Sequence, residues 1–131
     1  MHNEYNKQDI IIFNQLYDFC CLWHQKTKKF PKSDKYTLGQ KIFLELLDIL
    51  MLIHQARFEQ NYQKIKTLDK TSQMFDSVKI LIRMTYTLEI IEQKTYIELE
   101  NDLQNIGKML GGWLKYLKNP QTKATPLQNR P

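Results

Sequence analysis

Lysine and arginine side chains are the residues of this sequence whose type and spacing could do chemistry. Lys79 and Arg83 are four residues apart, which places them on one face of a predicted helix, and a second group of cations surrounds Pro31, with Phe30 and Tyr36 interleaved. The members of that second group are Lys26, Lys28, Lys29, Lys32 and Lys35. Both groups could form electropositive surfaces that neutralise phosphates.

Each basic group also has a plainer interpretation. The lysines around Pro31 fit a solvated loop, and Asp76, three residues before Lys79, could partly neutralise the other group. The formal net charge of +5 and a pI near 9.1 favour a polyanionic partner, either nucleic acid or an acidic protein. Charge alone does not decide between these partners.

Catalytic and metal-binding patterns are not found in the sequence. The histidines lie on different predicted segments without the spacing of metal ligands: His2, His24 and His54. Glu89 and Glu92 are at adjacent-turn spacing, which a solvated helix face explains, and Gly111-Gly112 lies late in a helix rather than in a phosphate-binding loop. We therefore expect no enzymatic activity and no metal or other cofactor.

The elements that must position these residues are predicted to be helices. The chain has 131 residues, and its 4 Gly and 4 Pro leave long uninterrupted segments. Apolar spacing of three and four predicts helices over residues 10–29, 38–60, 68–92 and 95–118, with Thr37 as an N-cap and a polar linker over 60–66. The sequence therefore predicts an all-α, up-down-up-down four-helix bundle over residues 1–118 and a disordered tail over 119–131.

The second predicted helix is apolar on nearly every side. Its charged residues, Lys41, Glu45 and Asp48, lie on one narrow stripe. A helix at the edge of a small bundle needs only one apolar stripe, so this helix must be covered on several sides. We therefore predict contact with another subunit, with Leu44, Leu47 and Met51 as candidate contact residues.

The glycines of the last predicted helix need an explanation, because a mid-helix Gly costs about 0.5–1 kcal/mol relative to Ala. Trp113 and Leu117 keep the apolar periodicity in phase beyond Gly111 and Gly112, which favours a continuous helix. Gly107 and Gly111 would then let another backbone come close. That neighbour could lie within the bundle or across a subunit interface.

Compartment signals are few. Cys20 and Cys21 are adjacent, and sequence neighbours rarely satisfy disulfide geometry. The N-terminus lacks the pattern of a signal peptide, and the most apolar run carries Lys41, Glu45 and Asp48, which makes it a poor membrane span. We expect a cytoplasmic protein that is not inserted in a membrane.

Several segments together resemble a known family. The segments are Phe30-Pro31-Lys32, Tyr36-Thr37-Leu38-Gly39-Gln40, Ile82-Arg83 and Ile106-Gly107-Lys108-Met109-Leu110-Gly111-Gly112-Trp113-Leu114. They are similar to the accessory variability determinant (Avd) proteins of diversity-generating retroelements, over about residues 10–118. The first two segments are shared with a wider group of four-helix bundle proteins encoded in 23S rRNA intervening sequences. That group usually ends helix two with an Asn-Ile-Ala-Glu-Gly-like motif, whereas this chain reads Leu52-Ile53-His54-Gln55-Ala56, which favours the Avd branch.

The resemblance implies a fold, an assembly and partners. Avd proteins are basic four-helix bundles that form barrel-shaped homopentamers and bind an error-prone reverse transcriptase and its template RNA. The complex makes cDNA mutated at template adenines, and Avd is not the polymerase. Lys79 and Arg83 occupy helix-three positions where the family places basic residues used in these contacts. Further candidates are the lysines Lys28, Lys29, Lys32, Lys35 and Lys41.

Two other functions stay open at this point. The chain could be an intervening-sequence protein of structural role, which an rRNA-gene location would reveal. It could also be a helical protein–protein module whose basic surface meets an acidic partner.

Overall fold

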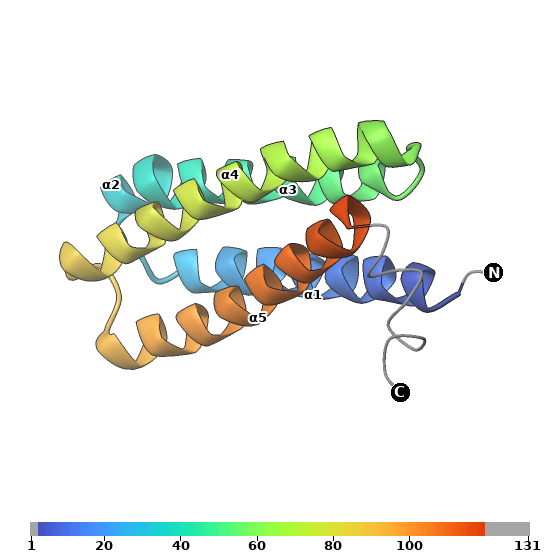
Figure 1. Cartoon of the computed structure of the whole chain (residues 1–131). Coiled ribbons are helices and arrows are strands. Elements are labelled where there is room, and N and C mark those ends of the chain that lie inside the picture. The colour runs from blue at the N-terminus through green and yellow to red at the C-terminus, as the bar shows by residue number, and fades with distance from the viewer. Residues whose placement is uncertain (1–2, 120–131) are drawn as a thin grey trace.

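Four stretches with apolar residues at three- and four-residue spacing form four long helices in the computed structural model, which describes residues 3–119 (Figure 1). They are α1 (Asn3–Thr27), α3 (Gln40–Ala56), α4 (Asn61–Thr87) and α5 (Gln93–Lys118). A short helix, α2 (Lys32–Asp34), and a π-helical turn, η1 (Lys35–Gly39), lead into α3. No strand occurs within residues 3–119. The predicted all-α four-helix fold is therefore confirmed.

Consecutive long helices run in opposite directions (Figure 1). α1 packs against α3 and α5, and α4 packs against the same two helices. Short connections enforce this arrangement, because a helix that follows a tight turn lies antiparallel to the one before it. Grooves lie between α1 and α5, between α4 and α5, and between α1 and α3, and these grooves differ in chemistry.

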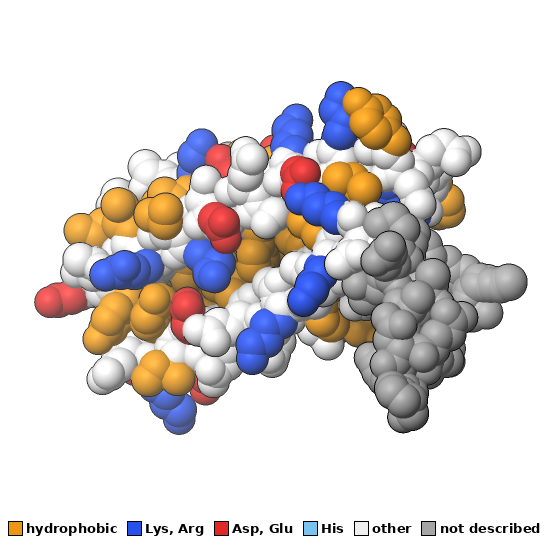
Figure 2. All heavy atoms as spheres, in the orientation of Figure 1, with side chains coloured by type: hydrophobic (Ala, Val, Ile, Leu, Met, Phe, Trp, Pro, Cys, Tyr) orange, Lys and Arg blue, Asp and Glu red, His pale blue; other side chains and the backbone are white. Residues whose placement is uncertain are grey.

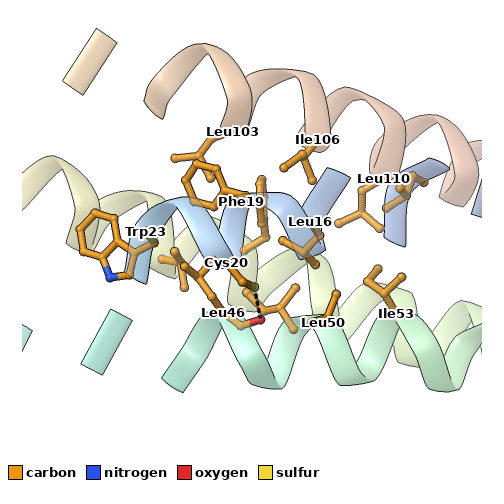
Figure 3. Packing of buried hydrophobic residues seen from close by; sticks show 14 of the residues in the cluster. Leu16, Phe19, Cys20, Trp23, Leu46, Leu50, Ile53, Leu103, Ile106 and Leu110 are labelled. Atoms are coloured by element: carbon orange, nitrogen blue, oxygen red, sulfur yellow. Dashed lines mark hydrogen bonds between the residues drawn. The ribbon is translucent and has the colours of Figure 1, made fainter. Parts of the chain in front are cut away.

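The core is built from the apolar stripes that the sequence predicts. The α5 stripe is buried throughout and consists of Leu99, Leu103, Ile106, Leu110, Trp113 and Leu117. Figure 3 shows how α1 inserts Leu16, Phe19 and Cys20 between side chains of α3 and α5. The Cys20 thiol lies 3.7 Å from the carbonyl oxygen of Leu46, and burial raises the pKa of this thiol to about 12. Cys20 is therefore a protonated core residue.

The entry to the second long helix differs from the prediction. Residues 32–39 are helical rather than a loop, and Thr37 is not an N-cap, because its hydroxyl donates to the carbonyl oxygen of Ser33 at 2.7 Å inside the helical segment. Pro31 is the N-cap residue before this segment, with a φ of −53° that its ring favours. The indole N–H of Trp23 donates to the carbonyl oxygen of Gly39 at 3.0 Å. A π-turn can present a carbonyl in this way, because it widens the helix.

The ends of α4 also differ from the prediction. The linker before it covers only residues 57–60, and the polar residues predicted to form the rest of the linker make the first turns of the helix. α4 ends at Thr87 rather than near residue 92, because Glu89 has a φ of 63°, a left-handed value that stops an α-helix. Glu89 and Glu92 therefore do not share a helix face.

The remaining boundaries shift less. α1 begins at Asn3 rather than near residue 10 and ends at Thr27 rather than near 29, and α5 begins at Gln93. The predicted disordered tail lies outside the described residues, apart from Asn119. Within residues 3–119, none of the helices has the length and apolar character that crossing a membrane requires.

Candidate nucleic-acid interface

One row of polar residues follows the outer side of α4 toward α5. Lys79 and Arg83 belong to this row, and Asp76 lies one turn before Lys79. Neither cation makes an ion pair within the described residues, so the predicted neutralisation of Lys79 by Asp76 is not observed at ion-pair distance. Arg83 lies close enough to Tyr96 of α5 to oppose the rise that burial produces in the pKa of that tyrosine. The row therefore faces the neighbouring helix.

A second row of cations lies on α5, and sequence reasoning missed it. Lys108 and Lys115 are exposed and unpaired within the described chain, whereas the Nζ of Lys118 lies 2.8 Å from the Oδ1 of Asp69 on α4. The spacing of Lys108, Lys115 and Lys118, by seven and three residues, places them on one side of a helix, but it does not show that this side lies next to α4. Figure 2 shows that Lys and Arg side chains lie along both helices of this face.

A groove of about 300 Å³ separates the two rows. It is lined by Ser72, Phe75, Asp76, Lys79, Gln104, Gly107, Lys108 and Leu110. Hydrophobic side chains are visible in the hollow between the two helices (Figure 2). We call this feature the α4/α5 basic groove and define it by its lining together with Arg83 and Lys115. Its rims can contact phosphates, and its apolar floor can contact bases.

The three glycines of α5 have different surroundings. A Cβ atom on Gly107 would lie 3.4 Å from the Cε2 of Phe75, so this glycine lets the α4 ring approach the α5 backbone closely. A Cβ atom on Gly111 would meet nothing within 4 Å, and one on Gly112 would meet only the side chain of Gln8 at 3.8 Å. Trp113 is fully buried inside the bundle. Gly111 and Gly112 are therefore exposed, whereas Gly107 is partly buried beneath Phe75.

The lysines around Pro31 lie elsewhere. Lys28, Lys29 and Lys32 are exposed, and the Lys35 ammonium lies 5.8 Å from the ring centroid of Tyr36. Lys29 borders a hollow near the α4–α5 turn that also contains Glu92. None of these lysines lines the α4/α5 basic groove. The structure therefore keeps the two predicted basic groups as separate surfaces.

Lys41 is the candidate with the weakest electrostatic case. Its Nζ lies 3.0 Å from a carboxylate oxygen of Glu45, one turn along α3. Because this carboxylate balances its charge, Lys41 adds little positive potential to its surroundings. It also lies on a helix that does not border the basic groove.

A different kind of groove lies between α1 and α3. It has a volume of about 440 Å³ and contains no Lys, Arg, Asp or Glu. Its lining consists of Tyr17, Cys20, Cys21, His24, Gln25, Phe43, Leu47 and Leu50. Beside it, Leu44 and Met51 are 51% and 57% exposed. We call this lining, with Leu44 and Met51, the α1/α3 apolar face.

Comparison with known proteins gives one result. A sequence model of the family described as bAvd-like matches residues 10–117. No curated protein and no solved structure shows a significant match. Within the described residues, no cluster of His, Cys, Asp and Glu is arranged to hold a metal ion.

Proposed function

Because the chain belongs to the bAvd-like family, we propose that it is a non-catalytic accessory protein of a diversity-generating retroelement. In this role it binds the error-prone reverse transcriptase of the element together with the template RNA and the cDNA copied from it. It supports mutagenic cDNA synthesis without contributing a polymerase active site. This role places the protein in the cytoplasm, where both partners are made.

The observation that carries the nucleic-acid part of this proposal is the α4/α5 basic groove. Lys79 and Arg83 on one rim and Lys108 and Lys115 on the other are all unpaired within the described chain. A groove with cations on its rims and apolar side chains on its floor suits a single strand, whose one phosphodiester backbone can follow the cations while its bases contact the floor. Such contacts hold a strand in position without reading its sequence, as an accessory protein requires.

We also propose that copies of the chain associate through the α1/α3 apolar face. Leu44 and Met51 are long apolar side chains left more than half exposed by their own bundle, and the groove beside them lacks charged residues. Burying such a surface against another subunit removes apolar area from water. Resemblance to Avd proteins implies five subunits. Association would repeat the basic groove around the assembly and strengthen its electrostatic field.

The direct test is co-purification. A tagged chain is expected to retain the reverse transcriptase and template RNA of its element and to stimulate cDNA synthesis. Lys79→Glu combined with Arg83→Glu should weaken RNA binding by about tenfold or more at moderate salt, because two phosphate contacts become repulsive. Lys41→Glu combined with Lys70→Glu makes the same change in net charge at exposed positions outside the groove and serves as the control.

Two outcomes would count against the proposal. Full retention of RNA, enzyme and cDNA synthesis by the Lys79→Glu, Arg83→Glu variant would remove the groove from docking. Failure of the wild-type chain to capture either partner would contradict the accessory role itself. A reverse-transcriptase gene and a template repeat beside the gene for this chain would support the role independently.

A further inference from the structure

Three long apolar side chains of α4 lie outside the bundle. Ile80, Met84 and Leu88 are 64%, 43% and 58% exposed, and their spacing of four residues places them on one side of the helix, which Leu88 caps. Figure 2 shows hydrophobic side chains on the outer side of this part of α4. We call these three residues the α4 apolar ridge. The ridge shares no residue with the α4/α5 basic groove or with the α1/α3 apolar face.

The ridge is separate from the cations on the same helix. Lys79 and Arg83 are the only charged residues between Ser77 and Leu88, and Lys79 lines the groove toward α5. An α-helix turns by about 100° per residue, so the side chains of Met84 and Leu88 point away from that groove. A protein surface that covers the ridge therefore leaves the α4/α5 basic groove open.

The α1/α3 apolar face has the shape that the ridge lacks. It contains a groove of about 440 Å³ that is lined by no Lys, Arg, Asp or Glu. Helices pack by inserting the ridges of one into the grooves of another, whereas two grooves brought face to face leave the space between them unfilled and lose packing contacts. Groove and ridge each occur on every copy of the chain, so one copy supplies the surface that the next one needs.

The groove and the ridge also lie in the same half of the bundle. α1 and α4 run in the same direction (Figure 1). The α1 residues that line the groove, among them Tyr17, Cys21 and Gln25, are in the C-terminal half of α1, and the ridge is at the C-terminal end of α4. Copies related by rotation about an axis parallel to the bundle therefore bring groove and ridge together at one level.

We propose that the α4 apolar ridge of one copy docks into the groove of the α1/α3 apolar face of the next copy. The inference rests on the association proposed above and names the surface that completes it. The contact joins two different surfaces of the chain, so it is head-to-tail, and such contacts close into a ring when the rotation between copies allows it. Because α4 carries both the ridge and one rim of the basic groove, each contact also fixes the position of one basic groove in the ring.

Mixing two variants of the full chain tests the contact. The groove variant is Leu44→Glu combined with Met51→Glu, and the ridge variant is Ile80→Glu combined with Leu88→Glu. Each variant alone should be a monomer of 15.8 kDa, because each lacks one half of every contact. An equimolar mixture should form dimers of twice that mass, since the intact ridge of the first variant fits the intact groove of the second and no further contact can form. Light scattering measures the mass, and circular dichroism checks that the helices remain.

Tyr62→Glu is the matched control. Tyr62 is 74% exposed and lies on the same side of α4 as Ile80, about five turns earlier, so this variant should keep the wild-type mass. A ridge variant that alone keeps the wild-type mass would overturn the inference and leave the α1/α3 apolar face in contact with its own copy. A mixture that stays monomeric would also overturn it. A monomeric wild-type chain would overturn both this inference and the association on which it rests.

Thiol cross-linking gives a second measurement that introduces no charge. Cys21 is exposed and lines the groove, whereas Cys20 is buried. In Ile80→Cys, a short bismaleimide should join Cys21 of one copy to the introduced thiol of the next and give a ladder of linked copies on a denaturing gel. Ile97→Cys, at a 49% exposed position on α5, should give no ladder. Pairs of wild-type chains linked through their Cys21 thiols would show that groove faces groove and would overturn the inference.

Discussion

The α1/α3 apolar face and the α4/α5 basic groove are built alike and differ in chemistry. Each is a groove between two antiparallel helices of the same bundle, with a volume of about 440 Å³ in the first and about 300 Å³ in the second. The first contains no charged side chain, whereas the second contains Asp76, Lys79 and Lys108. The difference therefore comes from the outward-facing positions of each helix pair rather than from the fold.

This difference determines which partner each surface can accept. An apolar groove gains free energy when water is removed from it, so it suits another protein surface. Lysines along a groove lose hydration when they are buried, and a polyanion compensates that loss with its phosphates. The charged residues are therefore unevenly distributed, because the groove between α1 and α3 is lined by no Lys, Arg, Asp or Glu.

The largest effect is expected from placing charge on the α1/α3 apolar face. Leu44→Glu combined with Met51→Glu should convert the assembly to monomers, because two carboxylates buried at a subunit contact cost on the order of several kcal/mol. Light scattering measures the molar mass, and circular dichroism checks that the helices remain. Ile97→Glu, at a 49% exposed position on α5, is the matched control. A wild-type chain that is already monomeric would contradict the comparison.

The next effect concerns the two rims of the basic groove. Lys79→Gln and Lys108→Gln should each weaken RNA binding several-fold and lower the slope of log K against log salt by about 0.7, the value for one phosphate contact on a single strand. Lys41→Gln, whose cation is paired with Glu45, should change neither quantity. Fluorescence anisotropy at several salt concentrations gives both. If only the Lys79 rim responds, the strand lies along α4 alone.

Much of this arrangement could be predicted from periodicity. The apolar stripe of α5 from Leu99 to Leu117 is buried as its spacing indicated. The exposure of Leu44 and Met51 follows from a helix whose apolar surface is wider than its own bundle can cover. These features depend on one helix at a time, which is why a sequence can show them.

Features that depend on two elements were harder to predict. The helical turn before α3 includes the Gly39 carbonyl, which accepts from the Trp23 indole, a contact between distant parts of the chain. The α5 rim of the basic groove could be recognised only after α5 was placed beside α4. The end of α4 depends on the positive φ of Glu89, and the residue type itself gave no reason to expect it.

A smaller effect tests whether the exposed glycine of α5 is used as a contact surface. Gly111→Ala should raise the unfolding free energy by about 0.5–1 kcal/mol, because a helical Ala loses less backbone entropy and nothing lies within 4 Å of the new methyl group. Gly107→Ala is the comparison, and its gain should be no larger, because its methyl would lie 3.4 Å from Phe75, at the lower limit of ordinary van der Waals contact. Thermal unfolding measures both. If Gly111→Ala stabilises the chain but weakens RNA or enzyme binding, a partner approaches the backbone there.

The smallest effect concerns the one buried carboxylate near the apolar side of the described chain. Burial raises the pKa of Asp9 above 3.8, against opposing effects of Arg57 and Lys64. Between 3.8 and the raised pKa the folded chain therefore binds more protons than the unfolded chain, so the contribution of Asp9 to stability falls as pH rises through this window.

Asp9→Asn removes this dependence, and urea unfolding from acidic to neutral pH compares the two proteins. Asp76→Asn, which removes an exposed carboxylate, controls for net charge. If wild type and Asp9→Asn show parallel curves, Asp9 is hydrated rather than buried, and the chemical separation of the two sides of the bundle is less complete than the structure shows.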